Sequence, residues 1–273
     1  MVAGNVAEDR APGGWAPGGP SLYTARMCVA LGARVTLVSA IPHGYPADAL
    51  DGISVSATPG GQAARYANTY DDAGHRTQLL LQEGSPIPLG LVQDACRDAD
   101  ALFLAPAYHE LSGVPPKPPG LVAVALQGLL RTHDDEGRVS PLPEPWPHVQ
   151  RFARDGAFLF YSDEDTAHPA TLASAASSTG AHVLVTRGAR GATHFAPGLP
   201  PVPLAALPAT PVEPTGAGDC FAAAFAVRML ETSDLTEACR WALAAGALAV
   251  QAPGLAGVPT RGMIEAHLRR EAA

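Results

Sequence analysis

The sequence contains little charge and almost no lysine. Only 16% of its 273 residues are charged, and Lys117 is its one lysine. A phosphate-binding loop of the GxxxxGK[ST] type is therefore absent, because that loop requires a lysine. Any bound phosphate must be held by arginine, by backbone N–H groups or through a metal ion. The net charge of −8 argues against nucleic acid as the main partner, since phosphate neutralisation needs clustered basic residues.

Cysteines and long apolar runs are also scarce. The four cysteines, Cys28, Cys96, Cys220 and Cys239, are far apart and form no CxxC pair, so neither a zinc site nor a disulfide framework is expected. No stretch reaches the roughly 18 apolar residues of a membrane span, and residues 1–6 lack the basic start of a signal peptide. We therefore expect a cytoplasmic protein with no membrane partner.

Apolar residues, in contrast, make up 47% of the chain, and short strand-like runs alternate with longer helix-like runs. This alternation predicts a mostly parallel sheet with helices on both faces, a three-layer α/β/α fold over residues 1–273. Ligands of such sheets bind outside the carboxyl ends of the strands. The expected strands are 1–6, 34–41, 101–105, 121–125, 157–161, 182–186 and 193–196, and the expected helices are 22–31, 89–97, 166–178, 217–231, 235–250 and 260–270.

Residues 52–82 differ from this pattern. Three short runs, 53–56, 65–70 and 76–81, look like consecutive strands. Glycines at 60 and 61 and the turn-forming residues 71–74 separate them. The first half of the chain is therefore not purely a series of strand–helix units.

The strongest motif is Thr215-Gly216-Ala217-Gly218-Asp219, which opens an almost wholly apolar helix. A helix so apolar must be buried, and its N-terminus then presents free N–H groups to an anion. The two glycines allow a phosphate to approach the backbone closely. Asp219 lies in the first helical turn, where a carboxylate could accept a proton from an attacking hydroxyl. The alternative is that Asp219 only caps the helix.

This TGAGD run resembles the second signature of the ribokinase-like (PfkB) carbohydrate kinases. Two other runs agree with that family, in the family's order. Gly18-Gly19, leading into a helix that ends in Leu31-Gly32-Ala33, resembles the first signature. The run from Thr186 to Gly191 resembles the strand and turn that precede the nucleotide site. Together the resemblance spans residues 4 to about 260.

The resemblance implies a ribokinase-like fold and transfer of the γ-phosphoryl group of ATP to an alcohol. Asp219 would be the base, and the N–H groups of Gly216, Ala217 and Gly218 would form an anion hole for the developing charge. Asp9, Gly18 and Gly19 would contact the acceptor. The implied ATP-binding residues are Thr186, Arg187, Gly188, Gly191 and Thr215.

Two departures from the family pattern affect the expected site. Tyr23 stands where many members have asparagine, which suggests an acceptor other than ribose. The family's NxxE motif, which organises the metal ion, is replaced by Ser162-Asp163-Glu164-Asp165. Glu164 and Asp165 could still organise Mg²⁺ through water. Alternatively, they only complement the dipole of the helix that follows.

The lid over the acceptor is a third departure. Asp9 and Gly18 are only nine positions apart, and Pro12 and Pro17 lack the N–H that a strand ladder needs. We therefore expect a reduced β-lid, with residues 10–17 irregular and part of 52–82 supplying the remaining cover. Trp15 should be free to cover the acceptor. No dimer clasped by paired lid strands is expected, and the oligomeric state stays open.

The acceptor is constrained by polar residues that follow two expected strands. Gln127 and Arg131 follow one strand and Glu110 follows the other, so all three are candidate substrate contacts, although each could equally lie in a surface loop. The Gln-Gly-x-x-Arg run, Tyr23 and the short lid are similar to the myo-inositol kinase branch of the family. The expected partner is a small sugar, polyol or nucleoside.

Two rival functions were weighed against the kinase. A dinucleotide-dependent oxidoreductase needs GxGxxG directly after the first strand, and residues 4–9 do not supply it. A non-catalytic, ligand-binding relative stays an alternative because the NxxE motif is missing.

Overall fold

The computed structural model describes residues 1–70 and 76–271. Its centre is a nine-stranded sheet in the order β15-β14-β13-β12-β9-β8-β1-β4-β5. All neighbouring strands from β13 to β5 run parallel, and β14 and β15 are antiparallel additions at one edge. The strands are β1 (Val2–Ala3), β4 (Val35–Ser39), β5 (Ile53–Ala57), β8 (Ala101–Leu104), β9 (Leu121–Ala125), β12 (Phe158–Ser162), β13 (His182–Thr186), β14 (Ala192–Phe195) and β15 (Val202–Leu204).

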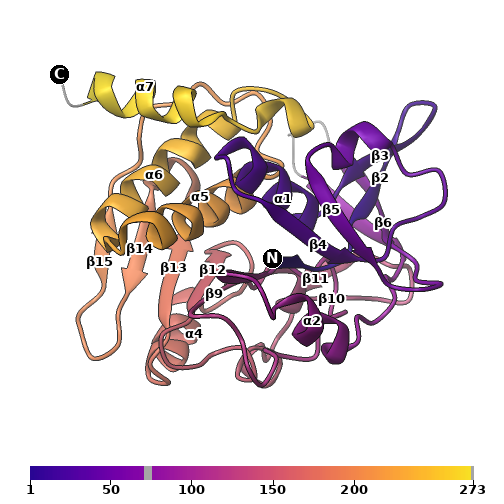
Figure 1. The fold of residues 1–273 in the computed structure, drawn as a ribbon, viewed down its shortest axis with the longest axis horizontal. Coiled ribbons are helices and arrows are strands. Elements are labelled where there is room, and N and C mark those ends of the chain that lie inside the picture. The colour runs from indigo at the N-terminus through magenta and orange to yellow at the C-terminus, as the bar shows by residue number, and fades with distance from the viewer. Residues whose placement is uncertain (71–75, 272–273) are drawn as a thin grey trace.

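Helices cover both faces of this sheet (Figure 1). One face carries α1 (Pro20–Ala30), α5 (Ala217–Thr232), α6 (Leu235–Ala249) and α7 (Arg261–Glu271), and the other carries α2 (Leu89–Ala95), α3 (Trp146–Val149) and α4 (Pro169–Ser177). Each face has its own hydrophobic core. The expected three-layer α/β/α fold is therefore confirmed. No helix within the described ranges has both the length and the apolar character needed to cross a membrane.

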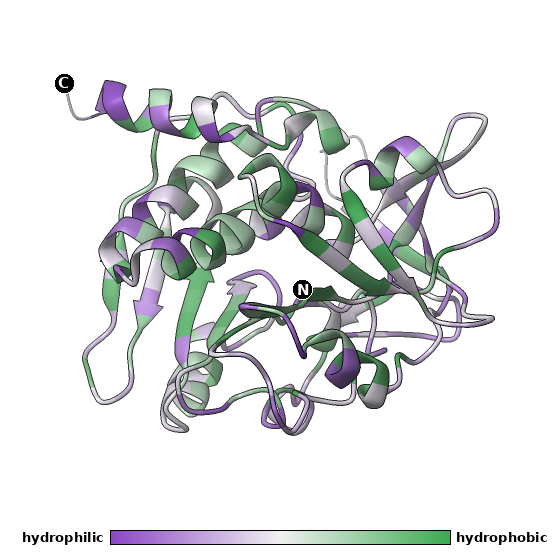
Figure 2. Cartoon of the chain, viewed as in Figure 1, coloured by the Kyte–Doolittle hydropathy of each residue, from purple (hydrophilic) through white to green (hydrophobic). Residues whose placement is uncertain are grey.

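Burial explains the apolar sequences of the central elements. Strands covered on both faces read as continuous apolar runs, as β12 does with Phe158 to Tyr161 buried. In α5, seven consecutive residues from Cys220 to Ala226 are buried. Figure 2 shows hydrophobic residues along the central strands, whereas α7, the outermost helix, carries hydrophilic ones. The helix that follows the TGAGD run is therefore buried, as its composition predicts.

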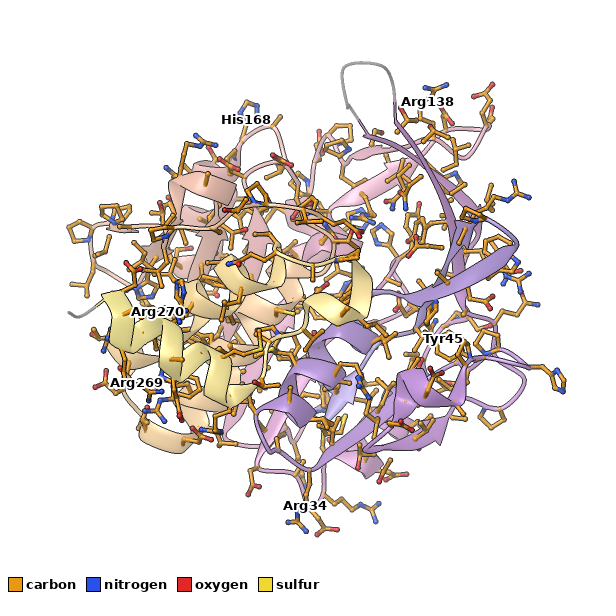
Figure 3. All side chains as sticks on the ribbon, turned by 90° about the horizontal axis from the view of Figure 1, so that it is seen from above. Arg34, Tyr45, Arg138, His168, Arg269 and Arg270 are labelled. Atoms are coloured by element: carbon orange, nitrogen blue, oxygen red, sulfur yellow. The ribbon has the colours of Figure 1, made fainter. Side chains whose placement is uncertain are left out.

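A second sheet forms the lid, in the order β3-β2-β6-β7. Its strands are β2 (Ala7–Ala11), β3 (Gly14–Gly18), β6 (Ala64–Tyr70) and β7 (Arg76–Gln82). The hairpin of β10 (Arg131–His133) and β11 (Val139–Pro141) lies beside β7, where Arg138 bridges to Leu79. Figure 3 places Arg138 beside the lid strands and Arg269 and Arg270 on α7, at the opposite side of the molecule.

The expectation that residues 10–17 are irregular is wrong. Strands β2 and β3 pair antiparallel from Ala7–Gly18 to Ala11–Gly14. Pro12 and Gly13 form the turn between them, and the φ of +86° at Gly13 is what the third position of a type II turn requires. Pro17 lies on β3, the edge strand of the lid, where a missing N–H need not cost a ladder bond. Residues 10–17 and part of 52–82 do share this second sheet, and its role as a lid stays a prediction. The turn expected at 71–74 lies outside the described residues.

Trp15 does not lie where the sequence analysis expected it. Its partner in the ladder is Arg10, and its ring lies under the guanidinium groups of Arg10 at 5.9 Å and Arg65 at 4.8 Å. Successive residues of a strand point to opposite faces, so Arg10 and Trp15 face away from Asp9. Trp15 therefore packs on the outer face of the lid and cannot cover an acceptor that is bound at Asp9.

The lid turn makes a stability prediction. Gly13→Ala should lower the free energy of unfolding by roughly 1 kcal/mol, because a side chain at positive φ is strained, and a Cβ there meets no atom within 4 Å. Gly90→Ala is the matched control, since its Cβ also meets nothing but the residue lies in helix α2. Its free energy of unfolding should rise by up to about 1 kcal/mol. Urea denaturation of both variants checks this, and equal effects would contradict the turn assignment.

Candidate active site

The N-terminus of α5 is the centre of the site. Helix α5 packs on the central strands β8, β9 and β12, and Gly216 is its N-cap with a φ of +78°. A Cβ at position 216 would overlap the ring of Tyr23. Glycine is therefore required here both by the left-handed backbone and by the close approach of Tyr23.

Asp219 is a half-buried carboxyl in the first turn of α5. It accepts no hydrogen bond from any residue that the structure describes, so it does not cap the helix through its side chain. The pKa of Asp219 is raised to about 7, chiefly by desolvation; the positive charge of Arg131 lowers this pKa and the negative charge of Asp165 raises it. A carboxyl with this pKa can accept a proton near neutral pH, which is the property of a general base.

The charges of Asp165, after β12, and Arg131, at the start of β10, act on this carboxyl. One oxygen of Asp165 accepts from the N–H of Ser162 at 2.8 Å, and the other accepts from Gln127 Nε2 at 3.4 Å. Burial raises the pKa of Asp165, and Arg131 again lowers it. The site thus holds two desolvated carboxyls, Asp165 and Asp219, in the field of one guanidinium group.

Asp9 enters from the lid. It lies on β2, and a Cβ at Gly18 would overlap its Oδ2, so the carboxylate lies against the second strand of the lid hairpin. Asn68 on β6 donates to Asp9 Oδ1 at 3.2 Å. Buried Tyr23 is near both ends of the site: burial raises its pKa, and the charges of Glu213, Asp219 and Asp9 raise it further. The lid carboxylate and the first turn of α5 therefore meet around the Tyr23 ring.

Glu110 lies in the interior rather than at the substrate side. It is 4% exposed, and its carboxylate accepts from the backbone N–H groups of Asn5, Ala107 and Tyr108, each at 2.7 Å. The backbone turns sharply just before it, at His109 with a φ of +53°. This placement favours a structural role, in which Glu110 holds the loop after β8, over the expected substrate contact.

The run from Thr186 to Gly191 turns the chain from β13 into the antiparallel strand β14. The N–H of Arg187 donates to the carbonyl of Gly191 at 2.7 Å. Arg190 forms an ion pair with Asp163 at 2.6 Å. The Nε of Arg187 is buried and has no hydrogen-bond partner among the residues that the structure describes. A buried donor without a partner is costly, so Arg187 is the residue of this turn whose side chain gains most by moving to meet an anion.

The backbone N–H groups of Ala217 and Gly218, which were also expected to contact an anion, differ in their surroundings. The N–H of Ala217 donates to the carbonyl of Pro214 at 3.2 Å and so closes the turn before α5. Gly218 is exposed at the helix end. The backbone of Gly218 is therefore better placed than that of Ala217 to meet an incoming anion.

A ready-made metal centre is not found within residues 1–70 and 76–271, where no three or more His, Cys, Asp or Glu side chains are grouped to hold an ion. Glu164 is exposed, and Asp165 is held by Ser162 and Gln127. Mg²⁺ commonly binds through one or two carboxylates, with substrate phosphates and water completing its ligands. The two carboxylates fit that arrangement and not a protein-only cage.

The site contains residues that sequence reasoning missed. Tyr66, Asn68 and Gln78 lie on the lid face that carries Asp9, as the strand register shows. Alternation along 64–70 predicts two faces for this strand. It does not say which face turns inward, because that depends on pairing with β2, more than fifty residues earlier.

Comparison with known proteins bears on the family and the fold of this chain. Residues 153–261 match the family model for pfkB family carbohydrate kinases. A ribokinase from Bacillus subtilis (strain 168) is 38% identical over 96 residues, which cover 35% of this chain and 32% of that relative. The aligned region is thus about a third of the relative's length.

Two solved structures match nearly the whole chain. A ribokinase from Arabidopsis thaliana, solved with ribose and ATP, has a TM-score of 0.69 at 21% identity and covers 98% of this chain and 97% of its own. A pyrophosphate-dependent kinase in the ribokinase family, solved with a pyrophosphate analogue and myo-inositol, has a TM-score of 0.71 at 18% identity, with coverages of 97% and 100%. At these identities the likeness shows that the fold is ribokinase-like.

The placement of Glu110 makes the second prediction. Glu110→Ala should lower the free energy of unfolding by about 3–5 kcal/mol, because each buried donor left unsatisfied costs roughly 1–3 kcal/mol. Glu110→Gln should cost less, since the amide oxygen can still accept from Asn5 and Ala107. Urea denaturation measures both. A Glu110→Ala protein with unchanged stability would return Glu110 to the list of candidate substrate contacts.

Proposed function

We propose that this chain, which carries a PfkB-family carbohydrate kinase sequence in residues 153–261 and has a ribokinase-like fold throughout, transfers the γ-phosphoryl group of ATP to a hydroxyl of a small sugar or polyol. The observation that carries the proposal is the state of Asp219. It has no hydrogen-bond donor among the described residues, its pKa is about 7, and it lies beside an N-terminal helix turn suited to anions.

In the proposed reaction, Asp219 takes the proton of the acceptor hydroxyl as the oxygen attacks the γ-phosphorus. The new O–P bond forms while the bond from the γ-phosphorus to its bridging oxygen breaks, and ADP leaves with the electron pair. The N–H groups at positions 216–218, Gly218 foremost, and the charge of Arg131 stabilise the negative charge on the transferred group. Positioning and electrostatics supply most of the catalysis in such transfers.

The donor would lie against the Thr186–Gly191 turn. The guanidinium group of Arg187, whose Nε has no partner in the described part of the chain, would supply a positive charge, and Gly188, Gly191 and Thr215 would allow the backbone to approach the donor closely. Mg²⁺ bound with the donor phosphates would have Glu164 and Asp165 as its nearest carboxylates, and it would neutralise phosphate charge. Pyrophosphate is a second donor to test, because a similar structure is a pyrophosphate-dependent kinase.

The acceptor would lie between the lid and the first turn of α5. Asp9, Gly18, Gly19 and Tyr23 would contact it from the first signature, and Gln127 and Arg131 from the β9 side. A carboxylate, an amide and a guanidinium suit a ligand with several hydroxyls. A nucleoside acceptor is the alternative within the same family. The buried free cysteines are consistent with the inferred cytoplasmic location.

A screen of donors against acceptors tests the proposal. ATP and pyrophosphate, each with Mg²⁺, are combined with sugars, polyols including myo-inositol, and nucleosides, and consumption of the donor is measured. We expect turnover with ATP and at least one sugar or polyol. Turnover confined to nucleosides would overturn the acceptor class. Ligand binding without any donor consumption would support the non-catalytic relative instead.

The third prediction concerns the role of Asp219. Asp219→Asn should lower turnover by about 10²- to 10⁴-fold, because the amide cannot take the proton. Asp98→Asn, a change at an exposed aspartate after α2, is the control and should leave turnover unchanged.

The same variant has a pH-dependent effect on stability. The folded pKa of Asp219 lies above its unfolded value, so the wild type loses stability as the pH rises from about 4 to 7. Asp219→Asn has no ionisable group at this position, so its free energy of unfolding should be higher than that of the wild type at pH 8. The two free energies should converge near pH 4. A near-normal turnover, or a variant that is less stable at pH 8, would remove Asp219 from the role of base.

The fourth prediction is the pH dependence of the wild type. A protonated Asp219 cannot accept the hydroxyl proton, so kcat/KM should fall tenfold per pH unit below about pH 7. Asp219→Glu is the control. The phosphates of the donor titrate in the same way with both proteins, so a difference between the two pH profiles comes from the carboxyl at position 219. An acidic limb near pH 4, or one that Asp219→Glu leaves in place, would contradict the assignment.

A further inference from the structure

A chain of side-chain hydrogen bonds crosses the lid from Asp9 to Arg131. Asn68 Nδ2 donates to Asp9 Oδ1 at 3.2 Å, and Gln78 Nε2 donates to Asn68 Oδ1 at 3.1 Å. Arg131 Nη1 donates to Gln78 Oε1 at 3.0 Å. The four residues come from β2, β6, β7 and β10, which lie far apart in the sequence.

The strand register brings these side chains to one face of the lid. Asn68 and Gln78 are direct partners in the antiparallel β6–β7 ladder, where opposing side chains are close enough to interact. Asp9 pairs with Tyr66, two residues before Asn68 on the same face. Both amides are half-buried, so water competes weakly for their hydrogen bonds.

The chemistry of the two ends sets the direction of this chain. An ionised carboxylate can only accept hydrogen bonds, and a guanidinium can only donate them. Each amide must therefore donate toward Asp9 and accept from the side of Arg131. The hydrogen bonds of two amides aligned between a negative and a positive charge strengthen one another. If either amide turned over, it would place two donors or two acceptors in contact.

Resting on the proposed function, we infer that Asn68 and Gln78 are positioning residues. They form a relay that holds Asp9 and Arg131 in the orientations that acceptor binding and transfer require. Asn68 is one of two asparagines in the chain, and the other, Asn5, is fully buried under the backbone of Ser85 and Ala40. Asn68 of the lid thus supplies an amide to Asp9, the carboxylate proposed to bind the acceptor. This chain has Tyr23 where related signatures carry asparagine.

The relay also reaches the candidate base. The titratable groups that face Asp219 are Arg131, Asp165, Tyr23 and Cys220. Arg131 is the positive charge among them, and the relay fixes its side chain through Gln78. Loss of that contact leaves the Arg131 side chain free to move away from Asp219.

Gln78→Met tests the relay, because methionine keeps the length of the side chain and removes both hydrogen bonds. Gln82→Met is the matched control on the same strand, where Gln82 donates to the carbonyl of Ala63 and lies outside the relay. Gln78→Met should raise the acceptor KM by about tenfold to a hundredfold and leave the donor KM within twofold. Gln82→Met should leave the acceptor KM unchanged.

A second measurement needs no turnover. The urea midpoints of Asn68→Leu, Gln78→Met and the double variant are compared with that of the wild type. If the relay exists, the double variant should lose measurably less than the sum of the two single losses, because both single changes already break the bond between Asn68 and Gln78. Additive losses would overturn the relay whether or not the protein is a kinase. An active wild type whose acceptor KM is unchanged in Gln78→Met would overturn the positioning role of the relay and leave the proposed function standing.

Discussion

The burial of α5 is the constraint on which the rest of the structure depends. The helix fills the space between the central strands and α1 and α6, and this is why Cys220 to Ala226 are apolar and buried. Its first turn, and with it Asp219, is thereby fixed at the edge of a desolvated space. Desolvation raises the pKa of that carboxyl, and Arg131 supplies the opposing charge. The packing of the core thus produces a carboxyl with a pKa near neutral, which is what the proposed role of Asp219 as a base requires.

The lid connects the acceptor side to this base. Its strand register divides it into an inner face, with Asp9, Asn68 and Gln78, and an outer face, with the Arg65–Glu8 ion pair and Trp15. A shift of one residue would exchange the two faces. The same register that places Asp9 on the inner face aligns the two amides toward Arg131. The proposed acceptor contact and the positive charge near Asp219 therefore depend on one set of strand pairings.

Much of the fold could be predicted from the sequence, because buried strands and helices have apolar patterns that can be recognised within a short stretch of sequence. Apolar strands, the apolar α5 and the TGAGD turn all depend on short-range pattern, and the structure shows the expected layers and sheet. The lid could not be predicted in the same way. The prolines of residues 10–17 argued against a strand, whereas Pro12 lies in the turn and Pro17 lies on an edge strand. Glu110 and the relay depend on contacts between segments distant in sequence, which no local pattern records.

The measurement that tests the account most directly is the titration of Asp219 itself. In protein labelled with ¹³C at the aspartate carboxyl carbons, the signal lost in Asp219→Asn identifies the group, and its chemical shift is followed from pH 3 to pH 9. The account predicts a midpoint at about pH 7. A midpoint near pH 4, the ordinary range of an aspartate, would show that the packing of α5 does not create the base, and would contradict the central claim.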